Sequence, residues 1–305
     1  MLQFILKRLL IIIPMALIVV TLTWALIRSA PGNFYSGEKA LPPAIEKNIK
    51  EKYGLDKPWY VQYGKLMSNI VQLDFGDSLK YEGQSVNEII RRHLPYSAVI
   101  GFFAYLVALA IGLFAGIVAA LRQNSPFDYL SMALSMLGLS VPSFVMGPIL
   151  VLVFALWLFW LPPARFGGIA SLVLPVVTLG AIYAAYIARL TRAGMLEVLR
   201  SDYIRTARAK GLDERTVLLK HALRGGIIPV VSFTGPALAS LLAGTVVVER
   251  VFAIPGLGNI FVQSVLNRDE PLTLGIVAFL SILIMIFNLL VDISYGYLDP
   301  RIRYE

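Results

Sequence analysis

Histidine and cysteine, the residues that most often bind metals or act as nucleophiles, are almost absent from this sequence. It contains no cysteine, which excludes disulfides, thiolate metal sites and thiol nucleophiles. His93 and His221 lie far apart, without an HExxH or comparable spacing, so we predict no metal site. The sequence also lacks a GxxxxGK[ST] phosphate loop, so we do not expect the chain to bind ATP. We predict no catalytic residue and no enzyme activity.

The densest group of charged residues lies at 191–226, where eight Lys or Arg accompany four acidic residues. Strong helix formers run from Met195 to Lys210, and Gly211 then provides a C-terminal stop. Asp213 and Glu214 suit the first turn of a second helix because of the helix dipole. The pattern therefore predicts a helix, a sharp turn and a second helix. The alternative is a basic amphipathic hairpin that lies on anionic lipid.

The composition indicates a membrane protein. Of the 305 residues, 57% are hydrophobic and only 15% are charged, whereas soluble domains carry about 25% charged residues. The net charge of +8 does not indicate nucleic-acid binding, because excess Lys and Arg in a membrane protein marks cytoplasmic loops and contact with anionic lipid.

Six apolar runs are long enough to cross a bilayer. The predicted spans are residues 9–27, 97–121, 130–160, 169–190, 227–248 and 272–297. The first run, preceded by Lys7 and Arg8, could be a signal peptide, but it exceeds an ordinary apolar signal core and Arg28 does not suit a cleavage region. We interpret it as an uncleaved span.

The third run is too long for a single straight span. A helix over 130–160 would extend about 45 Å, whereas the hydrocarbon core is about 30 Å thick. Pro142 and Pro148 lie inside it and should kink or interrupt it. We favour one tilted or bent span, and the alternative is a pair of short re-entrant pieces.

Gly112 and Gly116 in the second span form a GxxxG pair that would let another helix approach closely. A chance pair in a glycine-rich chain is the alternative. A polar segment at 31–96 follows the first span, and its aromatic residues predict a folded insert with short helices at 45–53, 61–71 and 86–92.

The distribution of basic residues predicts that both termini are cytoplasmic. With the N-terminus inside, short inner segments hold Lys7, Arg8, Arg122, the cluster at 189–224, Arg301 and Arg303. Short outer loops hold Arg165, Arg250 and Arg268. No Asp, Glu, Lys or Arg lies near the middle of a predicted span, which argues against a proton-coupled secondary transporter. A secondary transporter or channel and an intramembrane enzyme are the competing classes.

The stretch after Asp202 resembles the cytoplasmic coupling motif of binding-protein-dependent ABC importer permeases. Gly211 matches the motif glycine and Ala207 its second alanine, while Arg205 stands where the general pattern has glutamate. Arg-Thr-Ala at this place resembles the peptide-permease branch. The resemblance implies that these residues contact the ATP-binding subunit. The ten residues are Tyr203, Ile204, Arg205, Thr206, Ala207, Arg208, Ala209, Lys210, Gly211 and Leu212.

Further blocks along the chain resemble the peptide/nickel permease family. They are Pro31-Gly32, Tyr53 to Pro58, Asp74 to Ser78, Pro255 to Gly258, Asn267 to Pro271, Asn288 to Asp292 and Leu298 to Arg303. Taken residue by residue, we interpret them as structural: turns, bends and helix ends. The insert after the first span resembles that of the first of two paired permeases.

The resemblance implies an all-α integral membrane protein with six transmembrane helices and the type I ABC importer permease fold. Its parts would be the tail and first helix at 1–30, the extracytoplasmic insert at 31–96, the permease core at 97–300 with the coupling loop at 191–226, and the cytoplasmic tail at 301–305.

The same resemblance implies partners in the cell (inner) membrane. We expect a second homologous permease, two cytoplasmic ATP-binding subunits that hold ATP and Mg, and an extracytoplasmic substrate-binding protein. The expected substrates are dipeptides or oligopeptides, and nickel complexes or oligosaccharides are the alternatives. The sequence names no substrate-pathway residue.

Overall fold

The structure, a computed structural model, describes residues 2–29, 47, 51, 54, 56–163, 166–242 and 246–298. Helices make up its regular structure, and within these residues an isolated bridge between Asp77 and Ser85 is the one β pairing. The chain divides into two units. Unit 1 comprises Met1–Pro95 and Ile260–Met285, and unit 2 comprises Tyr96–Asn259 and Ile286–Glu305. The expected all-α class is confirmed.

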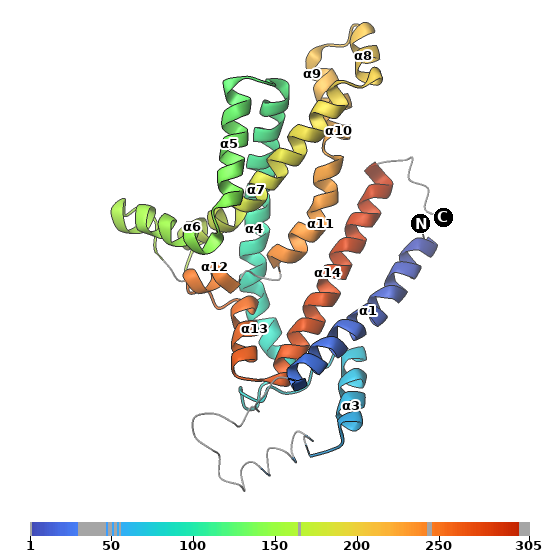
Figure 1. Cartoon of the computed structure of the whole chain (residues 1–305), viewed down its shortest axis with the longest axis vertical. Helices are drawn as coiled ribbons and strands as arrows, with labels where there is room; N and C mark the ends of the chain where they lie inside the picture. Colours follow the sequence, from blue (N-terminus) through green and yellow to red (C-terminus); the bar gives the residue numbers. More distant parts are fainter. Residues whose placement is uncertain are drawn as a thin grey trace. The chain divides into compact units, whose positions relative to one another are not determined.

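In unit 1, α1 (Leu2–Ser29) packs against α3 (Trp59–Val71). The rings of Trp24 and Tyr63 lie 5.2 Å apart between centroids, and the Tyr63 and Thr21 hydroxyls are 2.7 Å apart. Figure 1 shows α3 beside α1. The predicted helix at 61–71 is therefore confirmed. The one predicted at 45–53 lies outside the described residues except Lys47 and Glu51.

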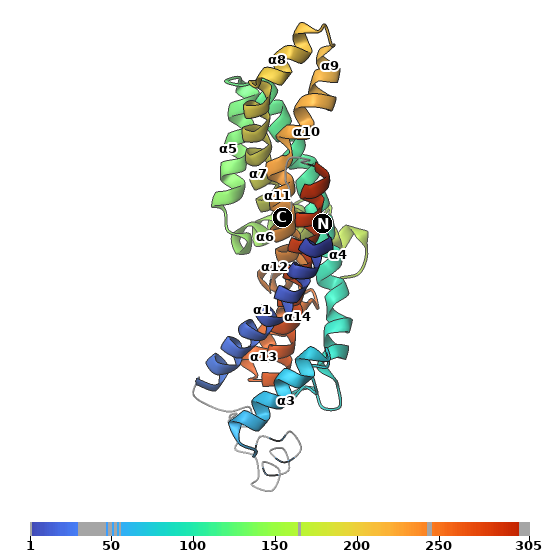
Figure 2. The ribbon, with the colours of Figure 1, turned by 90° about the vertical axis from the view of Figure 1, so that its right-hand side faces the viewer.

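In unit 2, α7 (Ile169–Leu199) is the central helix, with α4 (Val86–Leu121, in unit 2 from Tyr96) and α5 (Pro126–Ser140) beside it. Figure 2 shows α5 along α7. A Cβ on Gly112 would lie 2.8 Å from the Ala184 carbonyl oxygen, and one on Gly116 would lie 2.5 Å from that of Ala188. The predicted close approach of another helix at this GxxxG pair is confirmed, and that helix is α7.

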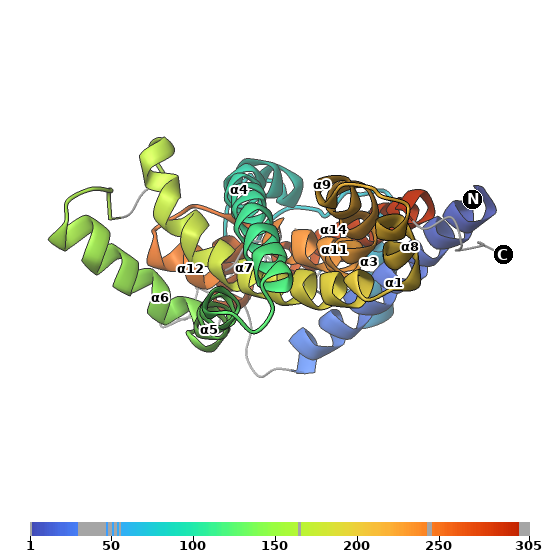
Figure 3. The same ribbon diagram turned by 90° about the horizontal axis from the view of Figure 1, so that it is seen from above.

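The third apolar run is broken after α5. Val141 is extended, with φ −87° and ψ 114°, as expected for a residue before proline, and α6 (Ser143–Leu150) starts after Pro142. The π-helical segment η1 (Val151–Trp157) continues α6, and the two arms meet at 105°. Figure 3 shows α6 running away from α5. The predicted interruption at Pro142 is confirmed, and a straight tilted helix is excluded.

Two boundaries differ from the predictions. The predicted short helix at 86–92 is not separate, because α4 runs through Pro95 into the second span. The predicted helix at 195–210 is split between Leu199 and Asp202. In the fifth run, α11 (Ile228–Leu242) precedes α12 (Val246–Val251), and residues 243–245 between them lie outside the described residues.

Four described helices are long and apolar enough to cross a membrane, namely Leu9–Ser29 in α1, α4, α7 and Glu270–Ser294 in α14 (Glu270–Leu298). Two bent pairs also qualify, α5 with α6–η1 and Glu214–Gly226 with Ile228–Leu241. If each pair is one span, the count is the predicted six. The predicted tail at 301–305 lies outside the described residues, as do Pro31-Gly32, Tyr53, Leu55, Arg165 and Asp299-Pro300.

The α4–α7 contact predicts that a methyl group added at Gly116 destabilises the protein, whereas one added at a glycine with open space around it does not. We expect Gly116→Ala to destabilise the protein by about 1–3 kcal/mol, because its Cβ would press on the Ala188 backbone. Gly64→Ala is the matched control, since no atom lies within 4 Å of its Cβ and alanine favours the α3 helix by about 1 kcal/mol. Thermal unfolding in detergent measures both, and equal melting temperatures would contradict the contact.

Candidate functional site

The charged loop folds into a helical hairpin at the end of α7. Ser201 has an extended backbone, with φ −73° and ψ 154°, and separates α7 from α8 (Asp202–Ala209). After the turn, α9 (Glu214–Thr216) leads into the π-helical segment η2 (Val217–Ala222) and α10 (Leu223–Gly226). Figure 1 shows this hairpin at the end of α7. The predicted helix–turn–helix is confirmed.

The split before α8 has a local cause. The Ser201 hydroxyl donates a hydrogen bond of 2.6 Å to the Val198 carbonyl oxygen. Serine side chains that bond to nearby backbone compete in this way with helical hydrogen bonding. The chain turns here although the flanking residues are good helix formers.

The turn after α8 is a Schellman motif centred on Gly211. The Gly211 N–H donates to the Arg208 carbonyl oxygen at 2.9 Å, and the Leu212 N–H donates to that of Ala207 at 3.4 Å. Gly211 has φ +77°, a left-handed conformation that a residue with a Cβ adopts only under strain. The predicted glycine stop is confirmed.

An ion pair joins the two arms of the hairpin. Arg208 Nη2 lies 2.6 Å from Glu214 Oε1, and its Nε lies 3.2 Å from Oε2, a bidentate arrangement. The second arm starts at Asp213, whose carboxylate accepts a hydrogen bond of 3.0 Å from the Thr216 N–H. Hydrogen bonds with Thr216 lower the pKa of Asp213, so this N-cap is ionised at neutral pH.

An apolar cluster holds the hairpin on its base. Ile204 is fully buried and Ala207 nearly so, and both pack with Met195 of α7 and Val217 of η2. Ala120 at the end of α4 belongs to the same cluster. Two of the ten predicted motif residues therefore face inward, and they act by packing.

The remaining motif residues form the outer surface of the hairpin. Tyr203, Arg205, Thr206, Arg208, Ala209, Lys210, Gly211 and Leu212 are exposed. Among the described residues Arg205 forms an ion pair with Asp202 of its own helix, at 3.4 Å, and its side chain is 74% exposed. The hairpin thus presents a mainly basic face on a packed support.

Glycines bring the base of the hairpin against α7. A Cβ on Gly194 would lie 2.4 Å from the Gly226 carbonyl oxygen, and one on Gly226 would lie 2.5 Å from the Met195 sulfur. The tandem Gly225-Gly226 was the sequence signal for this contact, which the sequence analysis missed. Beside it lies a cavity of about 550 Å³ whose wall includes the polar residues Tyr203, Lys220, His221, Arg224 and Glu197.

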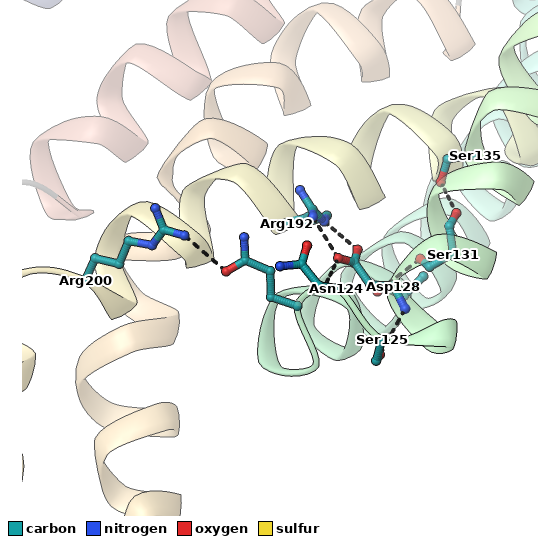
Figure 4. Close-up of polar contacts among 9 residues, drawn as sticks. Asn124, Ser125, Asp128, Ser131, Ser135, Arg192 and Arg200 are labelled. Carbon is teal, nitrogen blue, oxygen red and sulfur yellow. Dashed lines mark hydrogen bonds and ion pairs between the residues drawn. The ribbon is translucent and has the colours of Figure 1, made fainter.

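A buried ion pair ties α5 to α7 below the hairpin. Asp128 accepts bonds of 2.6 and 2.8 Å from the Arg192 guanidinium and one of 2.9 Å from the Asn124 N–H. Its side chain is 2% exposed, and that of Arg192 is 26% exposed. Arg200 adds a hydrogen bond of 3.1 Å to Gln123, which lies with Asn124 in the turn between α4 and α5. Figure 4 shows Arg192 pointing at Asp128. No local pattern in the sequence indicates this pair.

Two sequence blocks that suggested the permease family meet in unit 1. Buried Asp269 accepts a hydrogen bond of 2.5 Å from the Ser78 hydroxyl and bonds of 3.1 Å from the Leu79 and Lys80 N–H groups. It also caps α14 through the Leu272 N–H at 3.2 Å. The blocks Asp74 to Ser78 and Asn267 to Pro271 thus form a turn and a helix start, and the prediction that they have structural roles is confirmed.

A third block, Pro255 to Gly258, wraps a buried carboxylate in unit 2. Glu249 accepts a hydrogen bond of 2.6 Å from the Ser97 hydroxyl and one of 2.7 Å from the Asn259 N–H. A Cβ on Gly256 would lie 2.2 Å from the Glu249 carboxyl carbon, so glycine is required there. Glu249 directly follows the predicted span at 227–248, and nothing in the local sequence pattern indicates its burial.

Family models match most of the chain, and curated relatives match its full length. A model described as the binding-protein-dependent transport system inner membrane component matches residues 112–304, and its N-terminal counterpart matches residues 1–81. The chain belongs to this family. The Haemophilus influenzae oligopeptide transport system permease protein OppB is 45% identical, and the match covers 100% of both chains. The Bacillus subtilis dipeptide transport system permease protein DppB is 41% identical over 99% of this chain and 98% of its own.

Two solved transporters share the permease fold. The MetNI methionine ABC transporter in an inward-facing conformation has a TM-score of 0.59 at 18% identity, covering 69% of this chain and 96% of its own. An amino acid ABC transporter crystallised with histidines has a TM-score of 0.54 at 17% identity, covering 69% and 94%. The family match and the apolar helices show that the permease is a multi-pass inner-membrane protein and one subunit of an ABC importer complex.

The Asp128–Arg192 pair generates a stability prediction. We expect Asp128→Asn to destabilise the permease by roughly 3 kcal/mol, near the low end for a broken buried pair because Arg192 keeps part of its exposure. The control is Asp202→Asn, whose carboxylate is exposed and pairs only with Arg205. Thermal unfolding in detergent compares the two, and a smaller loss for Asp128→Asn than for Asp202→Asn would contradict the assignment.

The Arg208–Glu214 pair predicts a local effect. We expect Arg208→Ala to speed amide hydrogen exchange in α8 and α9. The free energy of local opening should fall by about 0.2–1 kcal/mol, a small amount because the pair is at the surface. Arg205→Ala, which removes no contact between the arms, should leave exchange unchanged. Equal exchange rates in the two variants would show that the ion pair does not hold the arms together.

Proposed function

We propose that this chain is a permease subunit of an ATP-driven peptide importer and forms half of the translocation pathway. Identity of 41–45% over nearly all of both chains to the oligopeptide and dipeptide relatives supports a peptide substrate. The exposed hairpin on its packed base supports a role in coupling. The partners we propose are a second permease, two ATP-binding subunits with ATP and Mg, and an extracytoplasmic binding protein.

In this proposal the chain does not hydrolyse ATP itself, in line with the missing phosphate loop. The hairpin lies on the cytoplasmic side with both termini, as the excess of Lys and Arg in short inner segments favours. The ATP-binding subunit docks against the exposed motif residues, while Ile204 and Ala207 keep α8 seated on α7 and η2. Docking thereby biases the helix bundle between two access states.

The test uses variants on the outer face of the hairpin. We expect Arg205→Glu to weaken ATPase docking, because it reverses a largely exposed charge whose ion pair among the described residues is with Asp202 of the same helix. Gly211→Trp should act more strongly, because a side chain at φ +77° distorts the turn. The measurement is affinity purification of the tagged permease in mild detergent, with quantification of co-purifying ATP-binding subunits and of peptide uptake by the cells.

Membrane insertion is the control for both variants and should match the wild type. Arg91→Glu, in the first part of α4, provides a matched reversal of an exposed arginine outside the hairpin and should leave docking intact. Normal ATPase recovery with Gly211→Trp at normal expression would contradict the coupling role. Uptake of a different substrate class would contradict the peptide proposal alone.

A further inference from the structure

An apolar groove lies among α4, α5 and α7, with a volume of about 360 Å³. Its rim carries large side chains that are about half or more exposed, among them Phe114 of α4 and Phe127, Leu130 and Leu134 of α5. Small residues of α7, the alanines between 181 and 188, line it as well. The groove exists because alanines on α7 do not fill the space that α4 and α5 leave.

The groove offers almost nothing to a polar ligand. Ser131 and Ser135 are the two hydroxyl residues in its lining. Both hydroxyls donate to backbone carbonyl oxygens, Ser131 to Ala115 at 3.2 Å and Ser135 to Ser131 at 2.9 Å. A peptide backbone would find no matching donors along this wall and would lose its hydration. Hydrocarbon is the chemistry that fits.

Two arginines are linked to the turn between α4 and α5, beside the groove and outside its lining. The Arg122 guanidinium carbon lies 4.7 Å from the centroid of the Phe127 ring, which is part of the rim. Arg200 donates a hydrogen bond of 3.1 Å to Gln123, the neighbour of Arg122 (Figure 4). Arg192 nearby is neutralised by Asp128, but neither Arg122 nor Arg200 forms an ion pair with another described residue.

We propose that this groove and its two arginines form a binding site for an anionic phospholipid. An acyl chain lies in the groove, and the phosphate contacts Arg122 and Arg200. Basic residues at the ends of transmembrane helices attract anionic headgroups, at about 1 kcal/mol per residue. A helix of a partner subunit would also cover the apolar wall, but a phospholipid combines hydrocarbon and an anion in one molecule, which matches the groove and the two arginines together. The site stands independently of the transported substrate.

The experiment is native mass spectrometry of the full-length permease, titrated with dioleoylphosphatidylglycerol or with dioleoylphosphatidylcholine. The two lipids have the same acyl chains and differ in headgroup charge. We expect tighter binding of phosphatidylglycerol, and about fivefold weaker binding of it in Arg122→Gln and in Arg200→Gln. Arg205→Gln, which removes an exposed arginine of α8 that is not in the groove lining, should bind as the wild type does.

A second pair of variants tests the groove itself. Leu134→Trp places an indole in the groove, whereas Leu137→Trp alters an equally exposed leucine of α5 outside its lining. We expect the first to reduce phosphatidylglycerol binding several-fold and the second to leave it unchanged. A photoreactive residue at position 134 should cross-link to lipid in native membranes.

Three results would overturn the proposal. Equal affinity for the two lipids would show that the two arginines do not select an anionic headgroup. Equal binding of phosphatidylglycerol by Leu134→Trp and Leu137→Trp would show that the acyl chain does not lie in the groove. Cross-linking of position 134 to another polypeptide rather than to lipid would assign this face to a protein contact.

Discussion

Inside a bilayer the hydrophobic effect does not drive one helix against another, since lipid tails are as apolar as leucine, and close van der Waals packing must do so. The core of unit 2 depends on that constraint. Along α7, small residues let neighbouring backbones approach: Gly180 meets α4 at the Ala104 carbonyl, Gly112 and Gly116 of α4 meet the middle of α7, and Gly194 meets Gly226. A methyl group at any of these glycines would push two backbones apart.

The same packing determines how the hairpin is held. Its base includes Met195, Ile204, Ala207, Val217 and Ala222, which are buried and form one apolar cluster. Packed cores of this kind are bistable, not continuously deformable. In the proposed coupling role, a partner bound to the exposed face would act on α7 as a body, and through α7 on the α4 and α5 helices packed against it.

Buried carboxylates add fixed points that packing alone does not supply. Asp128 is neutralised by Arg192, whereas Asp269 is held by a hydroxyl and several N–H groups, and Glu249 by Ser97 and the Asn259 N–H. A buried carboxylate without such partners would be costly. Each one joins segments that are distant in the sequence, which explains why short blocks scattered along the chain have structural roles.

The sequence by itself determined the features that depend on neighbouring residues. Apolar run length predicted the membrane helices, Pro142 predicted the break in the third run, and Gly211 with Asp213 predicted the turn and the start of the second arm. Tertiary structure decided which faces meet: the burial of Ile204 and Ala207, and the pairing of Asp128 with Arg192 and of Arg208 with Glu214. The reason is that a local pattern specifies a helix and its ends, whereas its rotation about its own axis is fixed only by the neighbours against which it packs.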